Sequence, residues 1–325
     1  MHFRTTAARV PSEQAFTADL DGGHRVGTRR SLATLCVGVV GLVACMGIGG
    51  CRLLTPPKVM LVMMENQSYS SVIGNAALPY VDQLAQQYGS ATDSYSLTHG
   101  SLPNYLEIVS GSVQGVTDDG PPSSHSFPVA PTLADQLVSG GYSVAAYAED
   151  LPADPTNDSG LYAVRHVPWE YFPSARITVK DASALIPDLN AASPPDFVWY
   201  TPNLTDDGDT GVPVDDEATE LAATESFLST FIPSVQSTSW YKSGGQIIIE
   251  WDEGVNSDTA GIDGSGGGHI PTLVVSQALA ANPQQLSGPV ATAGILHSLE
   301  HLYQVPYLGD AAVAANGNID SLLYW

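Results

Sequence analysis

The sequence predicts an α/β domain, a three-layer α/β/α sandwich with a mostly parallel central sheet. Short apolar runs bounded by polar residues alternate along the chain with stretches of helical periodicity. The apolar runs lack a polar face, which is typical of parallel strands that helices cover on both sides. Because ligands of such sheets bind beyond the carboxyl ends of the strands, polar residues that follow a strand are the first candidates for a functional site.

The predicted elements follow the chain in order. Residues 59–64 form the first strand, directly after a short linker that contains two prolines. Further strands are predicted at 142–147, 197–200, 247–251 and 272–275, and helices at 80–88, 132–137, 218–231 and 295–303. Stretches rich in Gly, Pro, Asp and Ser are predicted to be loops over one rim, at 112–130, 151–160, 204–216 and 254–268. We therefore expect a single domain over residues 59–325.

Residues 1–51 are interpreted as an N-terminal lead and an export signal, with a linker over residues 52–58. Residues 28–51 combine paired arginines, an apolar stretch and small residues before a cysteine, as cleavable signals do. A twin-arginine signal and an ordinary secretory signal both stay open. Lipobox-like residues precede two cysteines, so Cys51 is the preferred lipid anchor and Cys45 the alternative. We expect an exported protein, either a cell-surface lipoprotein or a secreted one, that contacts a membrane only through this anchor or an uncleaved signal.

The charge of the chain is unevenly distributed, with a formal net charge of −23. Seven of the 11 Lys and Arg residues but only three of the 34 Asp and Glu residues lie in residues 1–58, so four cations and 31 acids remain beyond them. Such a surface repels nucleic acid, which excludes a binding function that depends on a basic stripe. If the substrate is a phosphate ester, a bound metal ion must supply most of the positive charge.

Oxygen-bearing side chains follow two of the predicted strands. Glu65 and Asn66 come directly after the first strand, and Asp252 and Glu253 follow the strand at 247–251. Adjacent carboxylates repel one another unless a cation or solvent compensates them, and oxygen ligands suit a divalent cation. The pattern therefore predicts a metal site. The alternatives are that Asn66 caps a turn or helix and that the two acids are exposed to solvent.

Ser101 precedes a helix-like run in the segment THGSLPNY. N–H groups at the start of a helix would point at its oxygen and favour an anion there. Coordination to a divalent ion can hold such a hydroxyl in its reactive form at mild pH, so Ser101 is the candidate nucleophile. The alternative is a helix N-cap serine. Asn104 either helps to position the ester or shapes the first turn of the helix.

Seven collinear segments resemble the phospholipase-C-like phosphoesterases of the alkaline phosphatase superfamily. They are MENQSYSSVIGN, HGSLPNYLEIVSG, AYAEDLP, RHVPWEYF, TPNLTDDGD, WDEG and LEHLYQVPYLG, and they cover residues 59–310. The chain is most similar to the small secreted acid phosphatases of bacteria, because it lacks the length of the larger phospholipases C. The resemblance implies an alkaline-phosphatase-like fold.

The resemblance also implies roles for individual residues. Five of them would form one constellation of metal ligands with Ser101 as the phosphorylated nucleophile: Glu65, Asn66, Ser101, Asp252 and Glu253. His166, in the segment that resembles the family's HVPW stretch, would bind phosphate oxygens or protonate the leaving group. The alternative for His166 is a structural histidine packed beside Trp169.

The chain departs from the family pattern at two positions. Asp209 stands where the family has a histidine, and Thr292 stands where a second histidine precedes the last helix. In the wider superfamily these histidines help to hold a second metal or contact phosphate, so we expect the two replacements to change one shared subsite. Asp207 and Asp209 would then bind a harder ion such as calcium or magnesium, or line a vacant subsite beside a single metal. Other histidines could substitute, namely His99, His269, His297 and His301.

The sequence thus predicts a metal-dependent phosphoesterase, an acid phosphatase that hydrolyses small phosphate monoesters through a phosphoserine. One divalent ion is expected, with calcium, magnesium, manganese or zinc as its identity, and the expected partner is a small phosphorylated substrate. A phospholipase-C-type diesterase and a non-catalytic surface lipoprotein are the alternatives, and the missing histidines motivate the second of them.

Overall fold

The computed structural model describes residues 56–209, 216–264 and 266–324. The predicted lead, the export signal and both candidate lipid anchors, Cys45 and Cys51, lie outside the described residues. In the part of the chain that is described, no helix is both long and apolar enough to cross a membrane. The described residues all belong to one compact unit.

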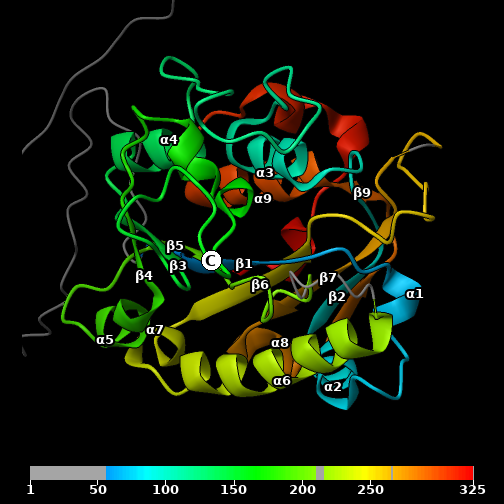
Figure 1. The fold of residues 1–325 in the computed structure, drawn as a ribbon. Helices are drawn as coiled ribbons and strands as arrows, with labels where there is room; N and C mark the ends of the chain where they lie inside the picture. Colours follow the sequence, from blue (N-terminus) through cyan, green and yellow to red (C-terminus); the bar gives the residue numbers. More distant parts are fainter. Residues whose placement is uncertain (1–55, 210–215, 265, 325) are drawn as a thin grey trace, which may run out of the picture. The chain divides into compact units, whose positions relative to one another are not determined.

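A nine-stranded sheet runs through the described residues in the order β4-β3-β5-β1-β6-β7-β2-β8, with β9 beside β2 (Figure 1). The strands are β1 (Lys58–Met64), β2 (Gly89–Tyr95), β3 (Val144–Ala148), β4 (Val179–Asp181), β5 (Phe197–Thr201), β6 (Gly245–Trp251), β7 (His269–Val275), β8 (Gln284–Leu286) and β9 (Val290–Ala291). Strand β7 is antiparallel to β6 and β2, and every other described pair is parallel. The prediction of a mostly parallel sheet is confirmed.

Strand β1 lies at the centre of the sheet because all six residues after Lys58 are apolar. Val59, Leu61 and Met63 pack into the core on one face of the sheet, and the intervening residues pack into a second core on the other face. A fully buried side chain of this size contributes about 1.5–3 kcal/mol of hydrophobic stabilisation. This burial on both faces fixes the register of β1 between β5 and β6, which pair with it in parallel.

Helices cover both faces of the sheet (Figure 1). Side chains of α3, α4 and α9 join the core on one face, and those of α2, α5, α6 and α7 join the core on the other. The helices are α1 (Tyr69–Val72), α2 (Pro79–Gln87), α3 (Ser101–Ser110), α4 (Leu133–Ser139), α5 (Leu185–Leu189), α6 (Glu217–Gln236), α7 (Ser239–Lys242), α8 (Gln277–Ala281) and α9 (Thr292–Tyr303). Short 3-10 helices are η1 (Val164–His166), η2 (Pro168–Tyr171), η3 (Ala182–Ala184), η4 (Gly309–Ala312), η5 (Ala314–Asn316) and η6 (Asp320–Leu322). The three predicted layers are therefore present.

Four strands, β2, β4, β8 and β9, are additions to the predicted set. Strand β2 reads GSATDSY, whose small polar residues show no apolar run. Its place in the sheet comes from pairing with β7, β8 and β9, which are distant in sequence. The other three strands are only two or three residues long. Such segments owe their conformation to neighbouring strands, so local sequence does not reveal them.

Helix α3 is held between two glycines. Gly100 precedes it with φ 95°, and Gly111 ends it in the left-handed conformation with φ 67°, where its N–H donates to the carbonyl of Glu107. Both angles favour glycine because it has no Cβ. The helix therefore begins at Ser101. Its first turn lies beside the carboxyl ends of the central strands, because Gly100 bonds to Glu253 and Ser101 bonds to Glu65.

Candidate active site

A pocket of about 620 Å³ lies beside the start of α3 and the carboxyl ends of β1 and β6. Asn66 and Glu253, which follow these strands, line it together with Ser101. Three of the four predicted loops contribute to its wall, through Asp119, Asp209 and residues 254–257. The predicted loops supply six of the 13 described residues that line the pocket.

Ser101 points at a buried carboxylate. Its Oγ donates a hydrogen bond to Glu65 Oε2 at 3.0 Å. Glu65 is fully buried, and its other oxygen accepts a hydrogen bond from the phenolic O–H of Tyr105. Tyr105 lies one turn along α3 from Ser101 and stacks on the ring of His166, with ring centroids 5.3 Å apart. Helix α3 therefore orients the hydroxyl and the carboxylate that receives it.

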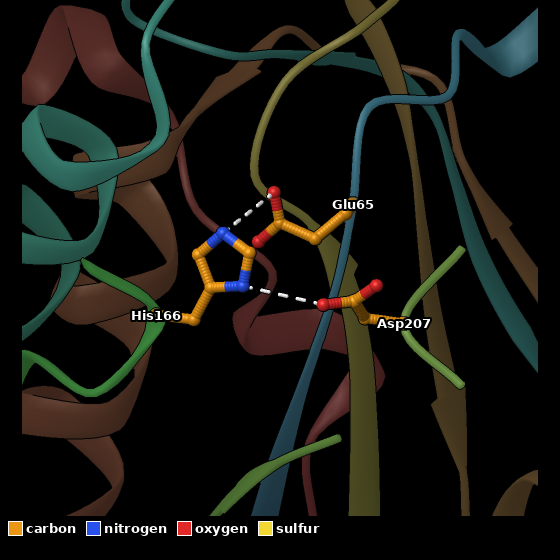
Figure 2. Close-up of side chains that lie close together, drawn as sticks. All are labelled: Glu65, His166 and Asp207. Carbon is orange, nitrogen blue, oxygen red and sulfur yellow. Dashed lines mark ion pairs between the residues drawn. The ribbon is translucent and has the colours of Figure 1, made fainter. Parts of the chain in front are cut away.

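Glu65, His166 and Asp207 form a buried group (Figure 2). Nε2 of His166 is 3.4 Å from Glu65 Oε2, and its Nδ1 is 3.2 Å from Asp207 Oδ2. One potential ligand atom from each residue lies within 4.8 Å of the others. The three residues come from the end of β1, from η1 and from the segment after β5. This group could hold a metal ion.

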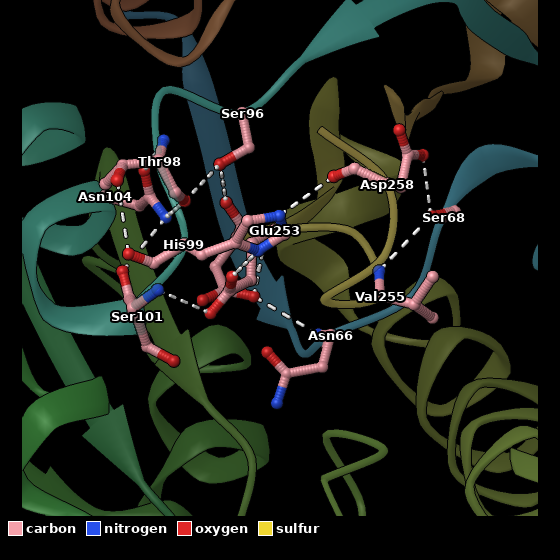
Figure 3. A network of polar contacts seen from close by, with 12 residues as sticks. Asn66, Ser68, Ser96, Thr98, His99, Ser101, Asn104, Glu253, Val255 and Asp258 are labelled. Atoms are coloured by element: carbon pink, nitrogen blue, oxygen red, sulfur yellow. Dashed lines mark hydrogen bonds and ion pairs between the residues drawn. The ribbon is translucent and has the colours of Figure 1, made fainter. Parts of the chain in front are cut away.

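Asp252 and Glu253 connect the ends of the central strands to one another and to the start of α3. Figure 3 shows Glu253 beside His99. Asp252 Oδ1 accepts hydrogen bonds from the backbone N–H of Asn66 at 3.3 Å and of Glu253 at 2.6 Å. Glu253 Oε1 accepts from the N–H of Gly100 at 3.1 Å, and its other oxygen contacts the ring of His99. One carboxylate thus joins the ends of β1 and β6, and the other joins β6 to the turn before the helix.

The carboxylates of the site repel one another in a buried environment. Burial raises the pKa of Glu65 well above its ordinary value, and the charges of Asp252 and Asp207 raise it further. Burial likewise raises the pKa of Asp207 and Asp252 well above the usual range. Burial and the nearby Arg165 lower the pKa of His166 far below its ordinary value, which leaves a neutral imidazole suited to metal binding. Together these groups favour a compensating cation.

Unpartnered atoms support the same conclusion. Asn66 Oδ1 and Asp252 Oδ2 are buried side-chain atoms without a hydrogen-bond partner. His166 Nε2 and Asp207 Oδ2 also lack a hydrogen bond and have only the ion-pair contacts within the buried group. Such atoms are expensive to bury unless something binds them. Oxygens with one imidazole nitrogen form a ligand set that suits a divalent cation. The residues present therefore fit the predicted metal ion.

Arg165 brings a guanidinium group to the pocket and is the only Lys or Arg among its described lining residues. Its Nη2 donates to Asp209 Oδ2 at 2.9 Å. The backbone N–H of Asp209 donates to Asp207 Oδ1 at 2.8 Å. Asp209 thus orients Arg165 at the pocket, while Asp207 faces His166. The two aspartates therefore have different side-chain partners, although we expected them to act on one subsite.

Thr292 lies elsewhere, which corrects the expectation of one subsite shared with Asp209. Asp209 lines the pocket beside Ser101, whereas Thr292 lines a separate pocket at the start of α9. The first residue of α9 follows β9, which pairs with β2 and not with the central strands. The two replacements therefore occur in different surroundings.

Asn104 and His166 lie deeper than their predicted roles require. Asn104 is fully buried, and its side chain bonds to the backbone of Thr98 and Gly100. It therefore holds the turn before Ser101. His166 is 1% exposed and does not line the pocket. This position suits a metal ligand better than a residue that contacts the leaving group. Its position between two carboxylates was not foreseen.

Residues 75–306 match the model of the Phosphoesterase family. The chain belongs to this family. A phosphatidylinositol-3-phosphatase of Mycobacterium tuberculosis is 28% identical over 286 residues, which cover 87% of this chain and 88% of that protein. A probable acid phosphatase of Kluyveromyces lactis is 27% identical over 169 residues, which cover 46% of this chain and 38% of that protein.

The fold of this Phosphoesterase family member is that of the alkaline phosphatase superfamily. A solved structure of a superfamily protein from Vibrio parahaemolyticus matches it with a TM-score of 0.55 at 15% identity, over 81% of this chain and 70% of that chain. Family membership makes the protein a hydrolase that acts on phosphoric esters. The recognition made from seven sequence segments is confirmed.

Besides Arg165, two further side chains that were not expected from the sequence contribute to the site of this phosphoesterase. Tyr105 bonds to Glu65, and Asp119 accepts a hydrogen bond from the backbone N–H of Leu102 at 2.9 Å. Tyr105 lies four residues after Ser101, so helical spacing could have placed it on the same face. Asp119 lies in a long loop, and no local pattern indicates that it folds back onto α3.

Proposed function

We propose that this phosphoesterase hydrolyses small phosphate monoesters through a phosphoserine on Ser101, with one divalent metal ion as cofactor. The observation that carries the proposal is the hydrogen bond to buried Glu65 from Ser101, which lines the pocket. A hydroxyl at the start of a helix, beside a carboxylate, is arranged for attack on an anionic ester. The names of the relatives, both phosphatases, agree with a monoesterase.

The cofactor would be held by Glu65, His166 and Asp207, with Asn66, Asp252 and Glu253 close by. When bound, a divalent cation supplies positive charge that stabilises phosphate oxygens and lowers the pKa of a neighbouring hydroxyl. Calcium, magnesium, manganese and zinc all suit this mixture of oxygens and one imidazole nitrogen.

The residues of the chain would act in two steps. The Ser101 hydroxyl passes its proton toward Glu65 as a bond forms between Oγ and phosphorus. The bond from phosphorus to the ester oxygen breaks, and that oxygen takes a proton from solvent and leaves as the alcohol; Glu65 returns its proton to Oγ when the phosphoserine is hydrolysed. Arg165, oriented by Asp209, offers its guanidinium to the phosphate oxygens. Water then attacks the phosphoserine, which releases inorganic phosphate and restores the hydroxyl.

Two assays test the proposal. Purified protein with added metal is given a phosphate monoester and a phosphodiester side by side, and we expect inorganic phosphate from the monoester at the higher rate. Ser101→Ala should abolish turnover and the acid-stable phosphoryl group that mass spectrometry detects on the quenched enzyme. Ser110→Ala is the matched control, because Ser110 is also buried in α3 but bonds to the carbonyl of Leu106. Full activity of Ser101→Ala would refute the nucleophile, and faster diester cleavage would replace the monoesterase with a diesterase.

We further propose export and lipid attachment through Cys51, with Cys45 as the alternative, so that any membrane contact passes through this anchor or an uncleaved signal. The support is the sequence of residues 28–51. Metabolic labelling with a fatty acid should mark the wild type and fail in Cys51→Ala. The Cys45→Ala variant and the double variant are tested in the same way. If all three variants are still labelled, neither cysteine is the lipid anchor.

A further inference from the structure

A second pocket of about 240 Å³ lies apart from the pocket beside Ser101, and the two have no described lining residue in common. It is formed where the end of β2 meets the first turn of α9, one face of α3 and the loop around Ile262. The loop that carries residues 254–257 at the first pocket carries Ile262 and Asp263 at the second. Neither the proposed reaction nor the predicted metal site uses this second pocket.

Two buried polar side chains of the second pocket lack partners. Glu107 and Thr292 are each 2% exposed, and Glu107 Oε2 and Thr292 Oγ1 have no hydrogen-bond partner. Both residues line the pocket. A buried carboxyl oxygen without a partner is costly, so its retention points to a ligand that supplies the missing hydrogen bond. Burial, with a contribution from Asp310, raises the pKa of Glu107 to about 7, which shows how poorly the carboxylate charge is compensated.

The charge of the pocket wall is of one sign. Glu107, Asp263 and Asp310 line it, and no described lining residue is Lys, Arg or His. Asn316 adds an uncharged amide. A ligand that binds among these carboxyl groups must itself be a cation or a strong hydrogen-bond donor.

Apolar side chains form part of the rim of the pocket, beside the exposed Asp263 and Asp310. Leu97 is 43% exposed and Val313 is 45% exposed, which makes them two of the five exposed large hydrophobic residues described. Ile262 lies on the same rim. Apolar side chains gathered around a few buried polar groups are the usual composition of a site for a small organic molecule. A bare metal ion would gain nothing from this rim.

We propose that the second pocket binds a small organic ammonium ion, with the charged nitrogen at Glu107 and Thr292 and the hydrocarbon part against Leu97 and Val313. An ammonium group carries three N–H donors, so it satisfies the carboxyl oxygen and the hydroxyl together. The hydrocarbon part removes exposed apolar surface from water. The assignment does not depend on the proposed reaction at Ser101.

Calorimetric titration of the full-length protein tests the chemistry of the ligand, with n-butylammonium chloride as the probe and n-butanol as its neutral counterpart. We expect saturable binding of the ammonium ion and affinity for the alcohol that is weaker by about tenfold or more, because a hydrogen bond to a charged group is lost. Equal affinity for the two compounds would overturn the proposal. So would binding of Mg²⁺ at the same pocket without binding of the amine.

Paired variants locate the probe. Glu107→Gln keeps the shape of the side chain and should weaken n-butylammonium binding by about tenfold. Glu300→Gln is the matched control, since Glu300 is also a buried glutamate with an unpartnered oxygen but does not line the pocket. Glu220→Gln removes a carboxyl from the pocket beside Ser101. Loss of binding in Glu220→Gln with retention in Glu107→Gln would place the amine in that first pocket and refute the assignment.

A steric variant keeps the test valid if Glu107→Gln folds poorly. Val313→Trp, at an exposed position on the rim, should block the pocket and abolish binding. Val129→Trp adds the same side chain at a position that is 94% exposed and away from the pocket, so it should bind the probe as the wild type does. Unchanged affinity in Val313→Trp would contradict the proposed position of the ligand.

Discussion

Asp119 Oδ1 accepts a hydrogen bond of 2.9 Å from the backbone N–H of Leu102, the residue that follows Ser101 in α3. Backbone N–H groups at the start of a helix favour anions, and here an internal carboxylate already occupies one of them. Asp119 also lines the pocket, so its charge faces any phosphate that approaches Ser101. The acid therefore holds the helix start in shape and opposes anion binding at the same time.

Replacing Asp119 with asparagine should tighten the binding of anions. The amide keeps an acceptor for Leu102 N–H but removes one negative charge from the pocket, which is worth about 1 kcal/mol or roughly fivefold in affinity. Competitive inhibition by inorganic phosphate is the measurement, and the inhibition constant should fall. Asp118→Asn is the control, because Asp118 pairs with His125 and does not line the pocket. A higher inhibition constant in Asp119→Asn would show that the carboxylate assists binding instead.

Replacing Asp207 with asparagine should have opposite effects with and without metal. In metal-free protein the change removes one of several buried carboxylates that repel one another, so the free energy of unfolding should rise by about 1–2 kcal/mol. The same change removes a candidate ligand, so stabilisation by added divalent metal should shrink. Thermal unfolding with chelator and with metal measures both effects. Asp154→Asn, at an exposed turn, should change neither, and a destabilised metal-free Asp207→Asn would contradict the assignment.

The central strands were predictable because each is an apolar run that can be recognised from its own sequence, without knowledge of the strands that pair with it. The run at 59–64 became β1, and the run at 247–251 became the end of β6. Strand β2 was not predictable, since GSATDSY carries no such run and depends on strands more than 170 residues away, as its pairing with β7 shows. Local composition thus identifies strands that are apolar and buried. It does not identify strands whose conformation depends on pairing with distant segments.

The residues of the site also differ in how far the sequence predicts their positions. Glu65 and Glu253 were predictable because the carboxyl ends of parallel strands meet at one edge of a sheet. Asp119 comes from a loop whose path depends on the packed structure, so its contact with α3 could not be foreseen. Thr292 does not share a subsite with Asp209, because alignment to a family position gives a place in the chain, whereas the pocket that Thr292 lines depends on how α9 begins.

Glu300 predicts a pH dependence of stability. Burial raises its pKa to about 8, while a glutamate in the unfolded chain titrates near its ordinary value of 4.5. Between these values the native state holds a proton that the unfolded state has lost, so stability is greatest at low pH and falls as pH rises toward 8. The contribution to the slope is at most about 1.4 kcal/mol per pH unit.

Glu300→Gln should flatten that part of the profile. Glutamine is always neutral and still accepts the hydrogen bond that Leu308 N–H donates to Glu300 Oε1 at 2.9 Å. Denaturant unfolding at several pH values from 5 to 8 should show the variant gaining stability relative to the wild type as pH rises. Glu217→Gln, at an exposed position, should follow the wild-type profile. A difference between Glu300→Gln and wild type that is constant with pH would mean that Glu300 titrates normally.

Gly267 allows a test of how the backbone positions the candidate nucleophile. A Cβ at this position would lie 2.1 Å from the carbonyl oxygen of Thr98, which accepts a hydrogen bond from Asn104 Nδ2 at 2.8 Å. Gly267→Ala must therefore displace the turn that leads into α3. We expect kcat to fall by about tenfold or more, because small displacements of a reacting group are costly, and stability to fall by about 1–3 kcal/mol. Gly288→Ala is the control, since nothing lies within 4 Å of its added Cβ. Unchanged kcat in a folded Gly267→Ala variant would show that the turn tolerates displacement and that the position of Ser101 does not depend on it.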